Sequence, residues 1–197
     1  MIRLPSVTFV IVENRWPQRV EKFCAYIRAN VQDAAITVKA DLPARADKAA
    51  YDRFCSLQLH ECFTTDHALV CQLDGFPVRW DLWEETFLDF DYLGAPWPPG
   101  WLRASGVDSD SRVGNGGCSL RSRRLCLALR DAPWTPAADD VFISALARPW
   151  LERKGMRFAD PVTAARFGRE YPTPEHAGVG QSFSFHDVRL HPHYAIF

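Results

Sequence analysis

The sequence predicts an α/β protein whose central, mostly parallel sheet is flanked by helices. Strand-like and helix-like segments alternate over the first part of the chain, which is typical of a parallel sheet with crossover helices. One strand-like segment, at residues 67–73, is almost wholly apolar, as a strand covered on both faces is. The length of 197 residues and the 47% share of hydrophobic residues fit one globular domain over residues 1–197.

The first elements follow this alternation. The run Val-Thr-Phe-Val-Ile-Val at residues 7–12 is β-branched and ends in a polar turn, which predicts a buried strand. After Pro17, apolar residues recur at helical spacing, and proline suits the first turn of a helix. In chain order we expect a strand over 7–12, a helix over 17–30, a strand over 35–39, a loop over 43–46, a helix over 49–63 and a strand over 67–73.

The second half of the chain has a different character. Tryptophan and proline gather between residues 76 and 101, and a polar segment at 103–112 predicts a mobile loop. Helical spacing predicts helices over 122–130 and 137–154, the second of which ends before Gly155. The tail is rich in Phe and His, and we expect it to be irregular.

Charge and composition exclude several classes of protein. The 23 Lys and Arg residues nearly balance the 24 Asp and Glu residues, so the basic excess of a dedicated nucleic-acid binder is missing. No apolar run reaches the roughly 18 residues of a membrane span, and the start does not resemble a signal peptide. We therefore expect a cytoplasmic protein, with association at the inner face of the membrane as the alternative. The six cysteines form no Cys-x-x-Cys pair and predict buried, reduced thiols.

Two loops are candidate ligand sites. Gln-Leu-Asp-Gly at 72–75 places a carboxylate at the end of a central strand, where open α/β sheets bind ligands. A plain Asp-Gly turn accounts for the same residues. Gly-Asn-Gly-Gly at 114–117 has three glycines in four positions, which indicates either a close backbone approach or a flexible hairpin turn.

Two further segments carry titratable side chains. Asp139 and Asp140 open a predicted helix, where the helix dipole and N-capping favour carboxylates, and a general base is the alternative. His186 lies in Phe-Ser-Phe-His-Asp at 183–187. A packed, hydrogen-bonded histidine and a ligand are both open interpretations there.

The order of these motifs resembles a known family. The series is Gln-Leu-Asp-Gly, then Asp-Tyr-Leu-Gly-Ala-Pro-Trp at 91–97, Gly-Asn-Gly-Gly-Cys-Ser-Leu-Arg at 114–121, Asp-Asp-Val-Phe at 139–142 and Phe-Ser-Phe-His. From Ala68 to His186 the chain resembles a bacterial and fungal family of glycosyltransferase-like domains of unknown function. That family is placed in the GT-A, or nucleotide-diphospho-sugar transferase, superfamily. The resemblance implies a GT-A-like fold with a Rossmann-like three-layer sandwich.

The resemblance also implies a role for each motif. Asp74 matches the second acid of the superfamily's metal-binding Asp-x-Asp motif, Gln72 stands in place of the first, and His186 matches the histidine that completes the metal site. Asp140 matches the carboxylate that supplies the base, with Asp139 beside it. Donor or acceptor binding is implied for Gln72, Gly75, Asn115, Gly116, Gly117 and Trp97, and nucleotide binding for Val12, Glu13 and Arg15.

The implied activity is metal-assisted transfer of a sugar from a nucleotide-diphospho-sugar to a glycan or lipid-linked acceptor, as in cell-surface polysaccharide synthesis. Oxygen ligands with one histidine suit Mg²⁺ or Mn²⁺. Because Gln72 replaces an acid, a catalytically degenerate module that binds a sugar nucleotide, a glycan or a partner protein is the alternative. A nucleotidyltransferase is less favoured, because residues 13–17 are not a basic, glycine-rich loop.

Overall fold

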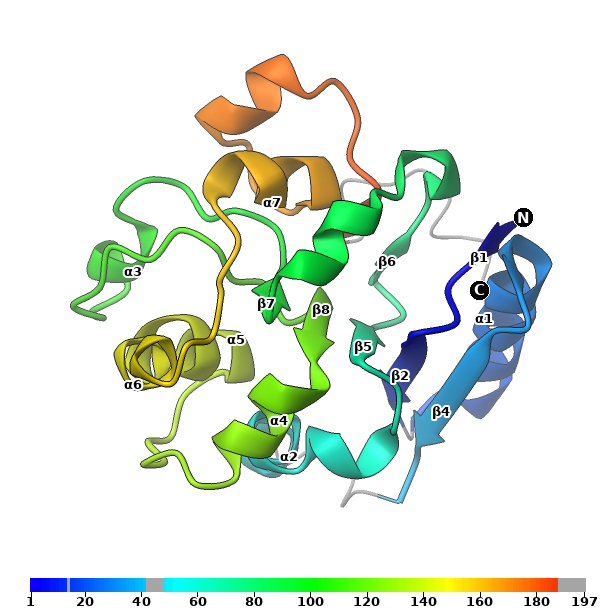
Figure 1. Cartoon of the computed structure of the whole chain (residues 1–197), viewed down its shortest axis with the longest axis horizontal. Coiled ribbons are helices and arrows are strands. Elements are labelled where there is room, and N and C mark those ends of the chain that lie inside the picture. The colour runs from blue at the N-terminus through cyan, green and yellow to red at the C-terminus, as the bar shows by residue number, and fades with distance from the viewer. Residues whose placement is uncertain (14, 42–47, 188–197) are drawn as a thin grey trace.

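The centre of the molecule is a five-stranded sheet with the strand order β4-β2-β5-β8-β7 (Figure 1). The structure is a computed structural model that describes residues 1–13, 15–41 and 48–187. The strands, in sheet order, are β4 (Ala35–Lys39), β2 (Val7–Val12), β5 (His67–Cys71), β8 (Cys118–Ser122) and β7 (Tyr92–Leu93). Strands were therefore predicted correctly over 7–12, 35–39 and most of 67–73.

The direction of the strands corrects the prediction of a mostly parallel sheet. Strand β2 pairs in parallel with β4 and β5, but β8 pairs antiparallel with both β5 and β7. The sheet is mixed because the chain does not return from β5 to β8 through a crossover helix. It runs instead through short turns of 3₁₀-helix, at Trp80–Leu82 and Glu85–Asp89, and through β7.

Two smaller sheets complete the strand structure. Strands β1 (Ile2–Arg3) and β3 (Val31–Gln32) pair in parallel, and β10 (Ser184–His186) lies between β6 (Gly75–Pro77) and β9 (Gly168–Arg169). The prediction of an irregular tail is wrong for β9 and β10, which are too short to show a strand pattern in the sequence. In the register of β10 with β6, His186 lies opposite Gly75. The end of the described chain thus reaches the turn that contains Asp74.

The first predicted helix is confirmed, and the second is shorter than expected. Helix α1 spans Pro17–Asn30, as predicted. Helix α2 (Lys48–Leu57) is followed by a separate 3₁₀ turn at Leu59–Cys62, because Gln58 has a φ of −120°. The remaining helices are α3 (Trp101–Ala104), α4 (Arg123–Leu129), α5 (Asp139–Val141), α6 (Arg148–Arg153) and α7 (Pro161–Phe167), with a further 3₁₀ turn at Pro174–Gly178.

The single helix predicted over 137–154 is three elements. Helix α5 is followed by a π-helical turn over Phe142–Leu146 and then by α6. Pro149 explains the break, because it has no N–H to donate and would interrupt the hydrogen bonds of a continuous helix. The predicted mobile loop 103–112 begins inside α3 and is tied by an ion pair between Arg103 and Asp110. The predicted loop 43–46 lies outside the described residues.

The apolar side chains of β2 alternate between two clusters. Phe9 and Ile11 belong to a large cluster that includes Phe23 and other residues of α1. Val10 joins a second cluster with side chains of α2. All six cysteines are buried, as the sequence predicted. In the described part of the chain, no helix combines the length and the apolar character that a membrane crossing needs.

Candidate active site

A pocket of about 530 Å³ opens at the carboxyl ends of β2 and β5. The 114–117 loop, the start of α5, the first turns of α2 and the end of β10 close it. Eight of the thirteen predicted site residues line it: Arg15, Gln72, Asp74, Gly116, Gly117, Asp139, Asp140 and His186. The fold thus brings together side chains that are up to 171 positions apart, from Arg15 to His186.

Other predicted residues lie behind the pocket wall. Trp97 is only 1% exposed and stacks on Trp101 at 5.0 Å between ring centroids. The structure does not bring Trp97 to the pocket, because its ring packs against Gly114, where an added Cβ would lie 1.9 Å from a ring carbon. Val12 is part of the core, and Asn115 is buried. Glu13 is also buried, and its carboxylate accepts a 3.1 Å hydrogen bond from the Arg15 Nε at the pocket.

The glycines of the 114–117 loop make room for functional side chains. A Cβ on Gly117 would lie 2.2 Å from the His186 ring, and a Cβ on Gly116 would lie 2.8 Å from Asp139 Oδ1. Asn115 has a φ of 64°, and its Oδ1 accepts a 2.9 Å hydrogen bond from the Gly117 N–H. The close-approach interpretation of these glycines is therefore confirmed, and the groups that approach are His186 and Asp139.

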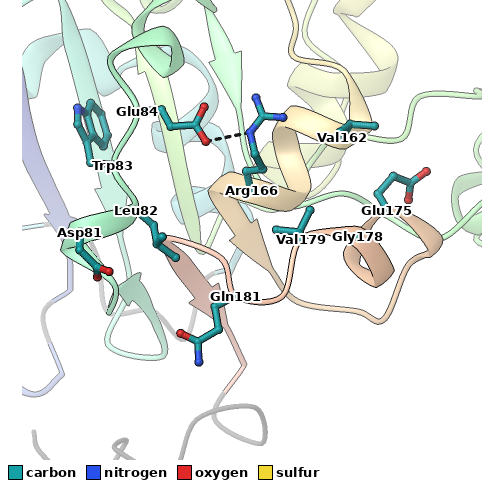
Figure 2. A pocket seen from close by; sticks show the side chains of 10 residues that line it. All are labelled: Asp81, Leu82, Trp83, Glu84, Val162, Arg166, Glu175, Gly178, Val179 and Gln181. Atoms are coloured by element: carbon teal, nitrogen blue, oxygen red, sulfur yellow. Dashed lines mark hydrogen bonds and ion pairs between the residues drawn. The ribbon is translucent and has the colours of Figure 1, made fainter.

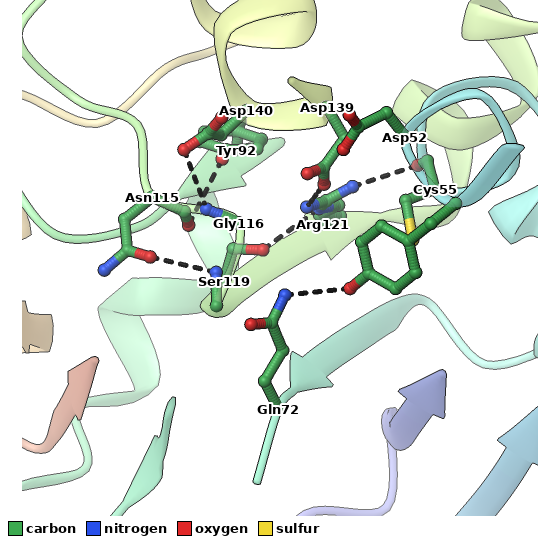
Figure 3. Close-up of polar contacts among 12 residues, drawn as sticks. Asp52, Cys55, Gln72, Tyr92, Asn115, Gly116, Ser119, Arg121, Asp139 and Asp140 are labelled. Atoms are coloured by element: carbon green, nitrogen blue, oxygen red, sulfur yellow. Dashed lines mark hydrogen bonds and ion pairs between the residues drawn. The ribbon is translucent and has the colours of Figure 1, made fainter. Parts of the chain in front are cut away.

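Asp139 is held by a buried arginine. Arg121 Nη2 in β8 donates to Asp139 Oδ2 at 2.6 Å, and Arg121 is fully buried (Figure 3). The sequence analysis missed this residue. An arginine in the apolar strand segment Cys-Ser-Leu-Arg-Ser was the available signal, because a buried arginine needs a buried acid beside it.

Asp140 has the environment of a general base. Its carboxylate accepts hydrogen bonds from the N–H groups of Gly116, at 3.2 Å, and Val141, at 2.8 Å. Burial, followed by the negative charges of Asp139 and Glu170, raises the pKa of Asp140 to about 6. A carboxylate of that basicity accepts a proton more readily than an ordinary aspartate does at neutral pH.

His186 is fixed between two carboxylates. Its Nδ1 lies 3.1 Å from Glu170 Oε1, and its Nε2 lies 4.0 Å from Asp74 Oδ1. Burial lowers the pKa of His186, but the hydrogen bond to Glu170 and the negative charges of Glu170 and Asp74 together outweigh burial and raise the pKa above the usual value. The sequence analysis missed Glu170, which follows β9 and reaches His186 because β9 and β10 pair.

Two of these side chains, Asp74 and His186, are suited to bind a divalent cation. Among the residues that the structure describes, no group of three or more His, Cys, Asp and Glu side chains could hold a metal ion. Asp74 and the Nε2 of His186 offer an oxygen and a nitrogen ligand, and the contact of Nδ1 with Glu170 is the kind of support that metal-binding histidines have. Mg²⁺ sites in proteins commonly take their other ligands from water and substrate phosphates.

Helix α2 supplies three pocket residues that the sequence analysis did not single out. Tyr51 accepts a 2.8 Å hydrogen bond from the side-chain amide of Gln72. Lys48 forms an ion pair with Asp52 at 2.6 Å. Burial raises the pKa of Asp52, an effect that the hydrogen bond from Lys48 opposes. The pocket therefore combines several acids with Arg15 and Lys48.

A family model described as "Protein of unknown function (DUF5672)" matches residues 34–186. The chain belongs to this family. The match contains ten of the thirteen predicted site residues, since only Val12, Glu13 and Arg15 precede it. A search of curated protein sequences finds no match for this DUF5672 chain.

A solved structure shares the fold of this DUF5672 chain. It is described as the crystal structure of a glycosyltransferase involved in the glycosylation of the major capsid of PBCV-1. The two chains share 13% sequence identity with a TM-score of 0.56, and the alignment covers 92% of each. The expected resemblance is therefore confirmed to the extent of a glycosyltransferase-like fold.

A second cavity, of about 480 Å³, lies away from these residues (Figure 2). It is bounded by α7, the Trp80–Leu82 turn and the Pro174–Gly178 turn, and an ion pair between Glu84 and Arg166 spans it. None of the thirteen predicted site residues lines this cavity.

Proposed function

We propose that this chain is a glycosyltransferase. It moves a sugar from a nucleotide-diphospho-sugar donor to a hydroxyl group of a glycan or lipid-linked acceptor, with the help of a divalent metal. We assign the reaction to cell-surface polysaccharide synthesis, on the cytoplasmic side of the membrane. The glycosyltransferase-like fold supports this proposal. The observation that carries it is the meeting of Asp140, Asp74 and His186 in one pocket, with the pKa of Asp140 raised to about 6.

Asp140 acts as the general base in this proposal. The acceptor hydroxyl gives its proton to the Asp140 carboxylate while its oxygen forms a bond to the anomeric carbon of the donor sugar. The bond between that carbon and the diphosphate oxygen breaks, and its electron pair leaves with the nucleoside diphosphate. Charge develops on the leaving group, so the site must supply positive charge there.

Asp74 and His186 would hold the metal, which would supply positive charge beside the diphosphate leaving group. Arg15 and Lys48 add positive charge on the side of the pocket formed by β2 and α2. Glu13 orients Arg15 through a hydrogen bond, and this is the contribution that we assign to Glu13 in nucleotide binding. Gln72 and the backbone of Gly116 and Gly117 face the space left for the donor sugar and the acceptor.

A thermal-shift panel tests this proposal. UDP-, GDP-, dTDP- and CMP-sugars are each added with and without Mn²⁺, since a ligand that binds the folded state raises the midpoint of unfolding. We expect one nucleotide class to give a metal-dependent shift, and Asp74→Asn to remove it. Matched assays follow transfer or donor hydrolysis, which Asp140→Asn should abolish without lowering the melting temperature. Full activity in both variants would contradict the site assignment.

A catalytically degenerate module is the second candidate. Gln72 favours it, because a neutral amide occupies the position of the first metal-binding acid and donates its N–H to Tyr51. In this case donors or glycans bind, but neither transfer nor hydrolysis is detected. Hydrolysis that depends on Asp140 would exclude this alternative.

A further inference from the structure

The two adjacent aspartates of α5 have different partners. Asp139 has a side chain that is 8% exposed and forms an ion pair with Arg121 at 2.6 Å. The Asp140 carboxylate accepts its hydrogen bonds from the backbone N–H groups of Gly116 and Val141. The N–H of Gly116 donates to Asp140 (Figure 3), and a Cβ added to Gly116 would lie 2.8 Å from Asp139 Oδ1. Among the residues that the structure describes, Asp139 therefore has a guanidinium partner, whereas Asp140, which lines the pocket, has none.

The hydrogen bonds of the Arg121 guanidinium fix the position in which it binds Asp139. Its Nη2 binds Asp139 in α5, its Nη1 donates to the Cys55 carbonyl oxygen in α2 at 3.0 Å, and its Nε donates to Ser119 Oγ in β8 at 3.0 Å. The guanidinium also lies over the ring of Tyr92, 5.6 Å from its centroid. A planar group with donors fixed on three elements has no alternative rotamer that satisfies them, and removing one partner of a buried ion pair is strongly unfavourable.

We propose that Arg121 is a positioning residue, which holds the Asp139 carboxylate in a buried ion pair and leaves the Asp140 carboxylate to accept the proton of the acceptor hydroxyl. This inference rests on the proposed function, because sugar transfer is the reaction in which Asp140 accepts a proton. It differs from the expectation that both aspartates are catalytic, since Asp139 would act through its charge and its packing.

The charge of Asp139 gives this second acid a role beside Asp140, the proposed base. Burial contributes most to the raised pKa of Asp140, and the fixed charge of Asp139 is the next cause, ahead of Glu170. Asp139 lies on the same helix, and groups from other elements also face this region. They are Tyr92 of β7, Arg121 of β8, Glu170 after β9, His186 of β10, Asp74 after β5, and Lys48 and Asp52 of α2.

Single amide substitutions distinguish the two acids. We expect Asp140→Asn to abolish transfer at every pH, because the proton acceptor is lost. Asp139→Asn should retain transfer, with the acidic limb of its pH profile displaced downward by about one unit, as expected when a neighbouring like charge is removed. Loss of transfer in Asp139→Asn together with retention in Asp140→Asn would overturn the proposal.

Substitution of the arginine tests its role directly. In Arg121→Met the Asp139 carboxylate loses its buried cation, so proton uptake is no longer confined to Asp140 and we expect the acidic limb of the pH profile to move. Arg124→Met is the matched control, because Arg124 also pairs with a buried acid, Asp91, outside the pocket. It should lower the melting temperature and leave the pH profile in place. Equal profiles for Arg121→Met and the native protein would overturn the proposal, and Asp139→Asn remains decisive if Arg121→Met does not fold.

A titration of the free protein separates this inference from the proposed function. Carboxyl ¹³C signals of the aspartates are followed by NMR as the pH changes, with no donor present. We expect a signal that titrates near pH 6, is missing in Asp140→Asn and shifts downward in Asp139→Asn. A signal missing in Asp139→Asn and unmoved in Asp140→Asn would contradict the role of Arg121. Failure of every donor to support transfer would contradict only the glycosyltransferase proposal.

Discussion

A single added methyl group at Gly117 should disable the His186 site. The Cβ of Gly117→Ala would meet Cδ2, Nε2 and Cγ of His186 at 2.2 to 2.5 Å, so the ring must leave its present position. We expect a loss of metal-dependent donor binding by about 10-fold or more, the range found when the support of a metal-binding histidine is removed. Overpacking should also lower the free energy of unfolding by about 1 to 3 kcal/mol.

Gly178→Ala is the matched control for that substitution. An added Cβ at Gly178 meets nothing within 4 Å. Its melting temperature should stay the same or rise slightly, since alanine restricts the unfolded chain more than glycine does. Donor binding by titration calorimetry, with unfolding followed by circular dichroism, compares the two. Native-like binding by Gly117→Ala would show that the His186 ring does not need this position.

At the scale of residues, the sequence predicted titratable side chains that line the pocket, but not the residues that hold them in place. Asp74, Asp140 and His186 were predicted from the order of the motifs, and all three line the pocket. Arg121 and Glu170 were missed because each acts on a residue brought near by strand pairing or helix packing, which spacing along the chain does not reveal. Trp97 was misplaced because an aromatic residue beside a loop suits packing as well as sugar stacking.

Helix α7 offers a test at the scale of a single element. Asp160 caps it, accepting hydrogen bonds from the N–H groups of Val162 at 2.9 Å and Thr163 at 3.0 Å. Asp160→Ala should lower the free energy of unfolding by about 1 kcal/mol, the usual cost of losing an N-cap, whereas Asp160→Asn retains an acceptor and should lose little. Urea unfolding of the two variants measures this difference, and equal losses would show that capping is not the cause.

Element boundaries were predictable where one local cause decides them. Pro17 and the helical spacing of the following apolar residues predicted α1, and the mostly apolar run at 67–71 predicted β5. The antiparallel direction of β8 could not be predicted, because it depends on the path of the 76–117 segment and not on the strand's own residues. Pro149 indicates a break before α6, and the prediction of one long helix over 137–154 did not take it into account.

The stability of the whole molecule should depend on an ion pair between distant segments. Arg112 donates two hydrogen bonds to Glu175, at 2.7 and 2.8 Å, and these bonds lower the pKa of Glu175 to about 2. Because the folded-state pKa is depressed, the contribution is complete above the unfolded pKa of about 4.5 and is lost as the pH falls toward 2. At neutral pH it amounts to about 3 kcal/mol at most, since one pKa unit corresponds to about 1.4 kcal/mol.

Glu175→Gln should therefore be less stable than the native protein at neutral pH, and the difference should shrink on acidification. Urea unfolding at a series of pH values measures it. Glu152→Gln is the control, because Glu152 pairs with Arg148 one helical turn away on the surface, and such pairs contribute about 0.3 to 0.5 kcal/mol. A constant difference across pH for Glu175→Gln would contradict the assigned role of the ion pair.

The six buried cysteines report on whether residues 1–197 unfold as one domain, which is a prediction that the fold does not itself test. Burial raises the pKa of Cys62 to about 11 and that of Cys126 to about 12, and only the thiolate reacts with disulfide reagents. We expect no fast-reacting thiol in the native protein. In urea, all six thiols should become reactive in one transition that coincides with the loss of circular dichroism.

Cys24 and Cys126 make this comparison informative, because they lie in different elements, α1 and α4. If residues 1–197 fold as one cooperative unit, labelling of both sites by mass spectrometry should give the same free energy of opening. Reaction of Cys24 at lower urea than Cys126 would show that α1 opens separately. A donor that binds between β2, β5 and α5 should then protect both thiols equally in the cooperative case, and unequally if α1 forms a separate unit.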